Sequence, residues 1–173
     1  TRDDLDGAEA FLREQIVAGE RDDRIRTSLI RFLAESRSAE AALEQTKLFI
    51  DEGTNTQLFR SIRATLNFDG GNQEEGISEL KELLESAEES EQTNEIRVTL
   101  ARMLDRTGNE VAARALTDTV LEHDPGMVDA LKMKATWLIR SDFADQAIIQ
   151  LRAALNQDPN NASVLMLMAD AHL

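Results

Sequence analysis

The chain has 173 residues and a net charge of −14, with 33 acidic residues against 19 basic ones. This charge argues against general binding to nucleic acid or to an anionic membrane surface, because both need a basic face. The absence of cysteine excludes disulfides, thiolate metal sites and a cysteine nucleophile, and two prolines, eight glycines and 42% hydrophobic residues favour a nearly all-helical protein.

Small residues recur along the chain at a near-constant spacing. One column has intervals of 34, 34, 37 and 34 residues, and a second has intervals of 37, 34 and 34. Repetition at this period is typical of solenoids built from helical hairpins. The first column is Ala8, Ala42, Gly76, Ala113 and Ala147, and the second is Ala64, Ala101, Ala135 and Ala169.

The first element expected is a helix within residues 1–22. Ala8 and Ile16 lie in register with the second helices of later hairpins, so this segment is predicted to be the second helix of a preceding repeat. Four repeats follow, with ends marked by Pro125 and Pro159. Their predicted ranges are 23–56, 57–93, 94–127 and 128–161.

Residues 162–173 are expected to form the first helix of a following repeat, because Ala169 is in register with the second column. Both ends would then fall within a hairpin, so we expect a segment of a longer repeat array. Because the chain begins at Thr1, an upstream export signal is not excluded, and the compartment stays open between cytoplasm and periplasm.

Each repeat predicts two amphipathic helices joined by a tight turn. The turns are expected at 36–37, 69–71, 107–109 and 141–142, where Gly permits a left-handed backbone and Asn, Asp or Ser caps a helix. Asp-Pro sequences at 124–125 and 158–159 separate successive repeats. The three extra residues of the 37-residue interval are assigned to 86–93, as a longer helix or a short loop.

The fourth repeat resembles the tetratricopeptide repeat (TPR) family. Ala147, Leu151, Ala154 and Pro159 stand where the family places Ala, a large apolar residue, Ala and Pro. The third repeat keeps part of this pattern, and the earlier ones keep the small residue and the spacing. The resemblance implies an all-α fold, a right-handed superhelical solenoid of about ten helices, with a concave groove that binds peptides or partner helices.

Arginine replaces the Trp that the family has near the start of the first helix, at Arg26, Arg60 and Arg97. We predict that these side chains pair with carboxylates on the preceding helix while their stems cover apolar surface. A ligand-binding role is the alternative.

The resemblance also places one residue set in the groove. On an acidic chain, its basic members form a basic island in the later repeats. Arginine suits carboxylates, so an acidic or C-terminal peptide is one expected partner; the alternative is pairing with Glu95, Asp105 and Asp129 nearby. The predicted groove residues are Arg31, Thr65, Phe68, Arg102, Arg106, Lys132, Thr136 and Arg140.

No constellation predicts catalysis, a cofactor or a metal. His123 and His172 have no partner at ligand spacing, and there is no phosphate loop or nucleophile elbow. The last helix has an uncovered apolar face at 164–171, which predicts a homodimer through that helix.

The sequence therefore predicts a non-catalytic scaffold that binds a partner protein or peptide, as part of a larger multi-repeat protein. Direct membrane contact is not expected. A structural spacer or oligomerisation arm is one alternative, and a substrate-positioning array of a parent enzyme or export system is another.

Overall fold

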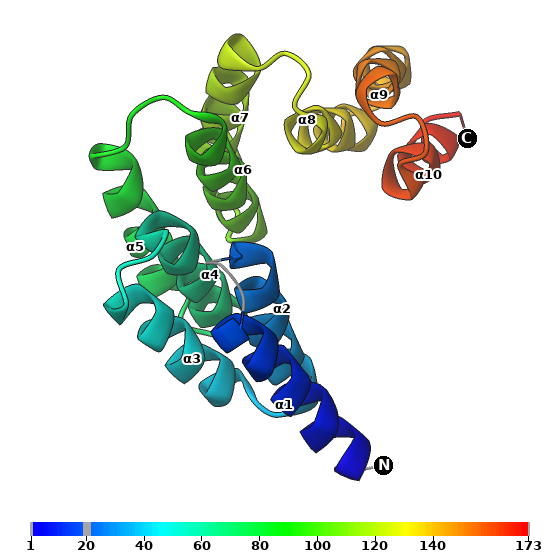
Figure 1. Cartoon of the computed structure of the whole chain (residues 1–173). Helices are drawn as coiled ribbons and strands as arrows, with labels where there is room; N and C mark the ends of the chain where they lie inside the picture. Colours follow the sequence, from blue (N-terminus) through cyan, green and yellow to red (C-terminus); the bar gives the residue numbers. More distant parts are fainter. Residues whose placement is uncertain (1, 19–21, 173) are drawn as a thin grey trace. The chain divides into compact units, whose positions relative to one another are not determined.

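The structure, a computed structural model, describes residues 2–18 and 22–172 of the chain. Within these residues the regular secondary structure is entirely α-helical, as the repeat pattern predicts, and it comprises ten helices (Figure 1). The helices are α1 (Arg2–Ala18), α2 (Asp23–Ser36), α3 (Ala39–Asp51), α4 (Thr56–Asp69), α5 (Gln73–Glu85), α6 (Glu91–Arg106), α7 (Glu110–His123), α8 (Val128–Arg140), α9 (Ala144–Gln157) and α10 (Ala162–Asp170).

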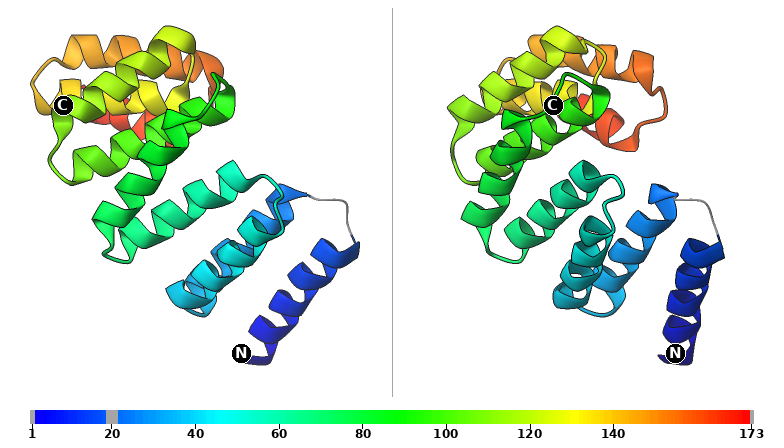
Figure 2. Two further views of the ribbon diagram at one scale, coloured as in Figure 1. Left: turned by 90° about the vertical axis from the view of Figure 1, so that its left-hand side faces the viewer. Right: turned by 60° about the vertical axis from the view of Figure 1, so that its left-hand side comes forward.

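The chain forms two compact units, Thr1–Leu83 and Leu84–Leu173. In the first unit, each of α1, α2 and α3 packs against the next helix along the chain, and the views of Figures 1 and 2 agree on this order. Its core gathers apolar side chains from α2, α3 and α4. These are Leu29, Ile30, Leu33, Ala42, Phe49 and Phe59.

Helices α4 and α5 come into close contact through a small residue of the repeat column. A Cβ atom added to Gly76 would lie 2.5 Å from the carbonyl oxygen of Ala64 and 3.0 Å from the Cβ of Phe68. Both Ala64 and Phe68 are buried. The columns of small residues therefore mark where the two backbones of a hairpin approach each other.

In the second unit, α6 packs against α7, α8 packs against α9, and α10 packs against both α8 and α9. One core joins these last three helices. It consists of Leu131, Ala135, Ala147, Leu151, Ala154, Val164 and Ala171.

The hairpin turns share one hydrogen bond that closes the first helix. The backbone N–H of Asn72 donates to the carbonyl of Asn67, and the same five-residue span recurs from Asn109 to Leu104 and from Phe143 to Leu138, at 2.8–2.9 Å. This is the longer bond of a Schellman motif, which needs a left-handed residue next to it. Gly71, Gly108 and Asp142 supply that residue, with φ of 99°, 82° and 61°.

The junctions between repeats are also alike. Asp124 follows α7 with φ −133° and ψ 87°, and Asp158 follows α9 with φ −134° and ψ 88°. Each donates its backbone N–H to the carbonyl four residues earlier, at 2.7 and 3.0 Å. In both places a proline comes next and prevents the helix from continuing.

The extra residues of the 37-residue interval are shared between a helix and a loop. Helix α6 has 16 residues against 14 in α4. Ala101 is the eleventh residue of α6, whereas Ala64 is the ninth of α4, so two residues extend the start of α6. The third lies in the loop 86–90, and α6 accordingly begins three residues before the predicted repeat start at 94.

The arginine column pairs with carboxylates, but the predicted direction is wrong for two of its three members. Arg26 bonds to Glu52, which follows α3, at 3.0 Å, and Arg60 bonds to Glu79 of α5 at 3.0 Å. Both partners come after the arginine in the chain, Glu79 within the next helix and Glu52 directly after it. The guanidinium of Arg26 also lies 5.0 Å from the centre of the Phe49 ring. Only Arg97 has its partner, Glu89, ahead of its own helix.

Candidate functional site

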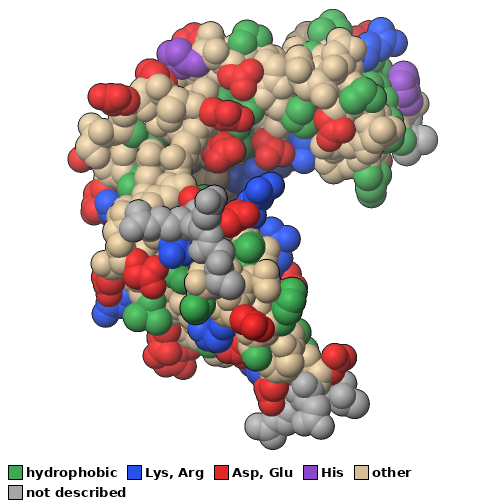
Figure 3. All heavy atoms as spheres, in the orientation of Figure 1, with side chains coloured by type: hydrophobic (Ala, Val, Ile, Leu, Met, Phe, Trp, Pro, Cys, Tyr) green, Lys and Arg blue, Asp and Glu red, His purple; other side chains and the backbone are tan. Residues whose placement is uncertain are grey.

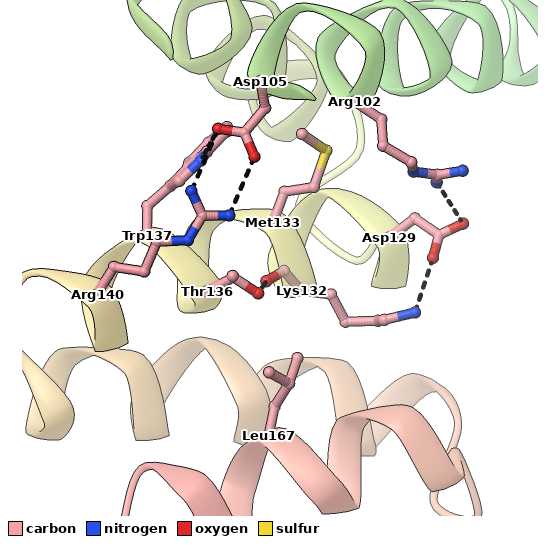
Figure 4. A pocket seen from close by; sticks show the side chains of 9 residues that line it. All are labelled: Arg102, Asp105, Asp129, Lys132, Met133, Thr136, Trp137, Arg140 and Leu167. Carbon is pink, nitrogen blue, oxygen red and sulfur yellow. Dashed lines mark hydrogen bonds and ion pairs between the residues drawn. The ribbon is translucent and has the colours of Figure 1, made fainter. Parts of the chain in front are cut away.

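The second unit has an open depression of about 380 Å³ (Figure 4). Helix α6 supplies one wall, α8 supplies most of the lining, and α10 closes one side with Leu167. The α8 residues are spaced three or four apart, which brings them to one face of a helix. The lining residues are Arg102, Asp105, Asp129, Lys132, Met133, Thr136, Trp137, Arg140 and Leu167.

At one end of the depression, Asp105 is held by two donors. Its Oδ1 accepts a hydrogen bond from Trp137 Nε1 at 2.8 Å, and its Oδ2 pairs with Arg140 Nη2 at 3.0 Å. Burial raises the pKa of Asp105, but the bonds from Arg140 and Trp137 and the charges of Arg140 and Arg114 outweigh it, so the pKa lies below its ordinary value. This carboxylate is ionised at neutral pH and fixes both partners.

At the other end, two cations share a single carboxylate. Asp129 lies 3.2 Å from Lys132 Nζ and 3.7 Å from Arg102 Nη2, as the dashed lines in Figure 4 show. The side chains of Arg102 and Asp129 are 54% and 52% exposed. Exposed ion pairs of this kind contribute little to stability and can exchange partners.

Glu95 lies near the start of α6, seven residues before Arg102 and so on the same face of the helix. Its pKa is raised, first by burial and then by the negative charges of Glu91 and Asp129. Asp129 therefore lies among charges of both signs: two cations pair with it, and the carboxyl group of Glu95 is close enough to be affected by its charge.

Three of the lining side chains are apolar or aromatic. They are Met133 and Trp137 of α8 and Leu167 of α10, and Trp137 is only 3% exposed. The guanidinium of Arg114 lies 5.0 Å from the centre of the Trp137 ring on the side of α7. The indole is thus fixed at its ring by Arg114 and at its nitrogen by Asp105.

Four of the eight predicted groove residues lie around this depression: Arg102, Lys132, Thr136 and Arg140. Arg31 lines a separate depression of about 280 Å³ in the first unit, on α2. Thr65 and Arg106 line neither of the two. The Thr65 hydroxyl donates to the carbonyl of Ser61 at 3.0 Å.

The prediction for Phe68 is wrong. Its side chain is 1% exposed, because it packs where α4 meets Gly76 of α5. The resemblance to TPR proteins predicts the helix face on which a residue lies, but it does not predict how far the side chain is buried.

Sequence reasoning did not select Met133, Trp137 or Leu167 for the groove. The signal for two of them was present, since Met133 and Trp137 stand four apart between the selected residues Lys132 and Arg140. Leu167 gave no such signal, because it comes from a different helix and was assigned to an apolar end face.

Within residues 2–18 and 22–172, no three His, Asp or Glu side chains are grouped closely enough to hold a metal ion. Among the helices described, none combines the length and the apolar character needed to cross a membrane. Acidic side chains are spread over the face drawn in Figure 3.

Comparison with known proteins gives relatives by structure only. No protein-family model matches the chain. No curated protein sequence matches it either. Among solved structures, MamA matches with a TM-score of 0.59 and 17% identity, covering 93% of this chain and 92% of MamA.

Two further solved structures extend the likeness. A tetratricopeptide repeat protein from Parabacteroides merdae matches with a TM-score of 0.66 and 18% identity, covering 99% of this chain and 67% of that protein. YrrB, described as a TPR protein with an unusual peptide-binding site, matches with a TM-score of 0.54 and 14% identity, covering 92% and 90% of the two chains. The helices of the described residues, the columns of small residues and these neighbours together show that the chain has the tetratricopeptide-repeat fold.

Proposed function

We propose that the chain is a non-catalytic interaction scaffold, and that the depression of α6, α8 and α10 binds an acidic segment of a partner protein. The observation that carries this proposal is the sharing of Asp129 by Arg102 and Lys132. The lining of the depression has three basic side chains against two carboxylates, so it has a net positive charge on a chain of net charge −14.

A carboxylate of the partner would complete this arrangement. Arg102 presents a planar fork of donors and Lys132 a compact ammonium group, so one carboxylate can accept from both. Because the existing pair of Arg102 with Asp129 is exposed and long, at 3.7 Å, the guanidinium can turn to a ligand without losing a strong bond.

The apolar side chains of the lining set the second requirement. Met133 and Leu167 offer a surface for one hydrophobic side chain next to the acidic one. Arg140 and Trp137 do not need a ligand, since Asp105 already holds both. The proposed recognition element is thus an acidic residue with an apolar neighbour in an extended or helical segment.

The fold supports an interaction role in general terms. YrrB, which shares the fold at 14% identity, is described as having a peptide-binding site. This likeness says nothing about the sequence that the present chain binds, so the acidic preference depends on Arg102, Lys132 and Asp129 alone.

The test uses a display library of random peptides, followed by fluorescence polarisation with the best peptide. We expect selection of peptides that contain Asp or Glu beside an apolar residue. Lys132→Gln should weaken their binding about five- to tenfold, which is about 1–1.4 kcal/mol and within the range of a typical net hydrogen bond.

The matched control is Lys134→Gln on the same helix. Lys134 pairs with Asp118 of α7 at 2.8 Å and does not line the depression, so binding should be unchanged. The proposal fails if the selected peptides show no acidic preference, if no peptide is selected, or if the two lysine variants weaken binding equally.

A further inference from the structure

The carboxylate of Asp129 stands between two basic side chains of the depression. Its Oδ1 lies 3.2 Å from Lys132 Nζ and its Oδ2 lies 3.7 Å from Arg102 Nη2, so each oxygen faces a different cation (Figure 4). These are the two groups from which a bound carboxylate would accept hydrogen bonds. Asp129 therefore occupies the place that an anionic ligand needs.

Asp129 can leave these cations at small cost. Its side chain is exposed, and ion pairs at exposed positions add little to stability. It is also the acidic residue in the first turn of α8, where the positive end of the helix dipole favours its charge even without a cation. Another anion can thus displace this carboxylate.

The second carboxylate of the lining is held differently. Asp105 is half-buried and accepts from Trp137 at 2.8 Å and from Arg140 at 3.0 Å. A ligand that took Arg140 would leave this carboxylate with one donor fewer in a partly desolvated position, which is unfavourable. Competition with a ligand is therefore expected at Asp129 and not at Asp105.

The charge of the depression depends strongly on Asp129. The lining has three basic side chains against two carboxylates, one of which is Asp129, so its net charge is +1. Without the charge of Asp129 there would be three against one, and the net charge would double to +2. A single carboxylate thus sets half of the attraction that the lining can exert on an anion.

We propose that Asp129 is an internal competitor for the acidic residue of the partner and determines which anions the depression accepts. It removes most of the advantage that a doubly charged group, such as phosphoserine, would have over a single carboxylate. The second charge is attracted by the cations, but it is also repelled by Asp129, which stays close to them. This role rests on the proposed function, because an acidic segment must enter the depression.

The experiment compares the unmodified chain with Asp129→Asn, which nearly keeps the shape of the side chain and removes its charge. Peptide display is carried out on both chains. The best acidic peptide is then synthesised with its selected Asp or Glu and with phosphoserine in that place, and fluorescence polarisation measures its binding to each chain. Because Asp129 is exposed, the fold should be retained, and circular dichroism checks this.

Asp129→Asn should bind the acidic peptide about three- to tenfold more tightly, because two exposed ion pairs no longer compete with the ligand. The affinity for the phosphoserine peptide, divided by that for the carboxylate peptide, should also rise about three- to tenfold. This ratio changes because the second charge of the phosphate is no longer repelled by Asp129. A purely structural role of Asp129 would alter both affinities alike and leave the ratio unchanged.

The matched control is Asp118→Asn, which removes one negative charge outside the depression. Asp118 is exposed, pairs with Lys134 and does not belong to the lining, so both affinities should change by less than about twofold.

The role of Asp129 is overturned if Asp129→Asn binds the acidic peptide no more tightly than the unmodified chain does, or if the phosphoserine ratio is equal in the two chains. It is also overturned if Asp118→Asn has the same effect, or if neither chain selects an acidic peptide. Selection of acidic peptides by Asp129→Asn alone would contradict the proposed function of the unmodified chain and support the competition by Asp129.

Discussion

Asp105 is the residue on which the depression of the second unit depends most. The pKa of its carboxyl group is lowered, and its side chain is only 17% exposed. It connects α6 to α8 through Trp137 and Arg140. Its lowered pKa means that the folded state binds its proton more weakly than the unfolded chain does. Asp105 therefore stabilises the fold above the unfolded pKa of about 3.9, and this contribution is lost as the pH falls through the lower folded value.

Replacing Asp105 tests this role. Asp105→Ala leaves the buried indole N–H of Trp137 without its acceptor, so we expect a loss of about 1–3 kcal/mol in the free energy of unfolding. Asp105→Asn keeps an acceptor and should cost less. Urea unfolding followed by the fluorescence of Trp137, the single tryptophan, measures both.

The pH dependence separates charge from packing. The stability difference between the unmodified chain and Asp105→Asn should be largest near neutral pH and shrink below about pH 4. Asp118→Asn is the control, because Asp118 is 58% exposed and pairs only across the surface with Lys134. A difference that stays constant with pH would mean that the charge of Asp105 has no part in stability.

At the level of helices, the hairpins depend on how closely two backbones approach. Gly76 is the tightest case in the first unit, with the Ala64 carbonyl in the place where a side chain would begin. Leu80 and Leu83, which follow Gly76 in α5, are buried and closely packed. Because of this packing, α5 cannot move away from α4 without losing contacts.

Gly76→Ala should accordingly destabilise the chain by about 1–3 kcal/mol, because overpacking forces α4 and α5 apart. The matched control is Gly7→Ala in α1, where a Cβ meets nothing within 4 Å. There the higher helix propensity of alanine should be neutral or stabilise by up to about 1 kcal/mol. Thermal unfolding by circular dichroism decides; equal behaviour of the two variants would contradict the close-packing argument.

Much of this level could be predicted from the sequence, for a physical reason. Turns such as 107–109 depend on local chemistry, because Gly108 permits the left-handed backbone that ends one helix and Asn109 caps the start of the next. The partners of Arg26 and Arg60 could not be predicted, since a long side chain reaches either neighbouring helix. The sharing of Asp129 by Arg102 and Lys132 depends on how α6 and α8 are placed in space. The spacing of residues along a single helix does not give this placement.

At the scale of the whole molecule, the two units have separate cores. The core of α2, α3 and α4 and the core of α8, α9 and α10 have no residue in common. Trp137 belongs to the second unit, so its fluorescence reports on that unit, while circular dichroism reports on all helices.

Because the cores are separate, we expect circular dichroism and Trp137 fluorescence to respond differently to a substitution in one unit. Gly76→Ala should shift the circular dichroism transition in urea and leave that of Trp137 nearly unchanged, because Gly76 and Trp137 lie in different units and the repeats of a repeat protein can unfold separately. Leu151→Ala, in the core of the second unit, should shift the Trp137 transition, with a cost of about 2–5 kcal/mol. Coincident shifts in both probes would show instead that the chain unfolds as one cooperative body.

The matching junctions after α7 and α9 have a consequence for how such a chain grows in evolution. Asp124 and Asp158 have the same backbone angles to within 1°, and 34 residues separate them. A gene duplication of the 34 codons between these points would insert one hairpin with the same junction at each of its ends. The new hairpin would then pack against neighbours of the same kind as before. Lengthening the array is then a single genetic event that creates no new interface, whereas a gain of another size has to be taken up by a helix end or a loop, as the three extra residues before Ala101 are.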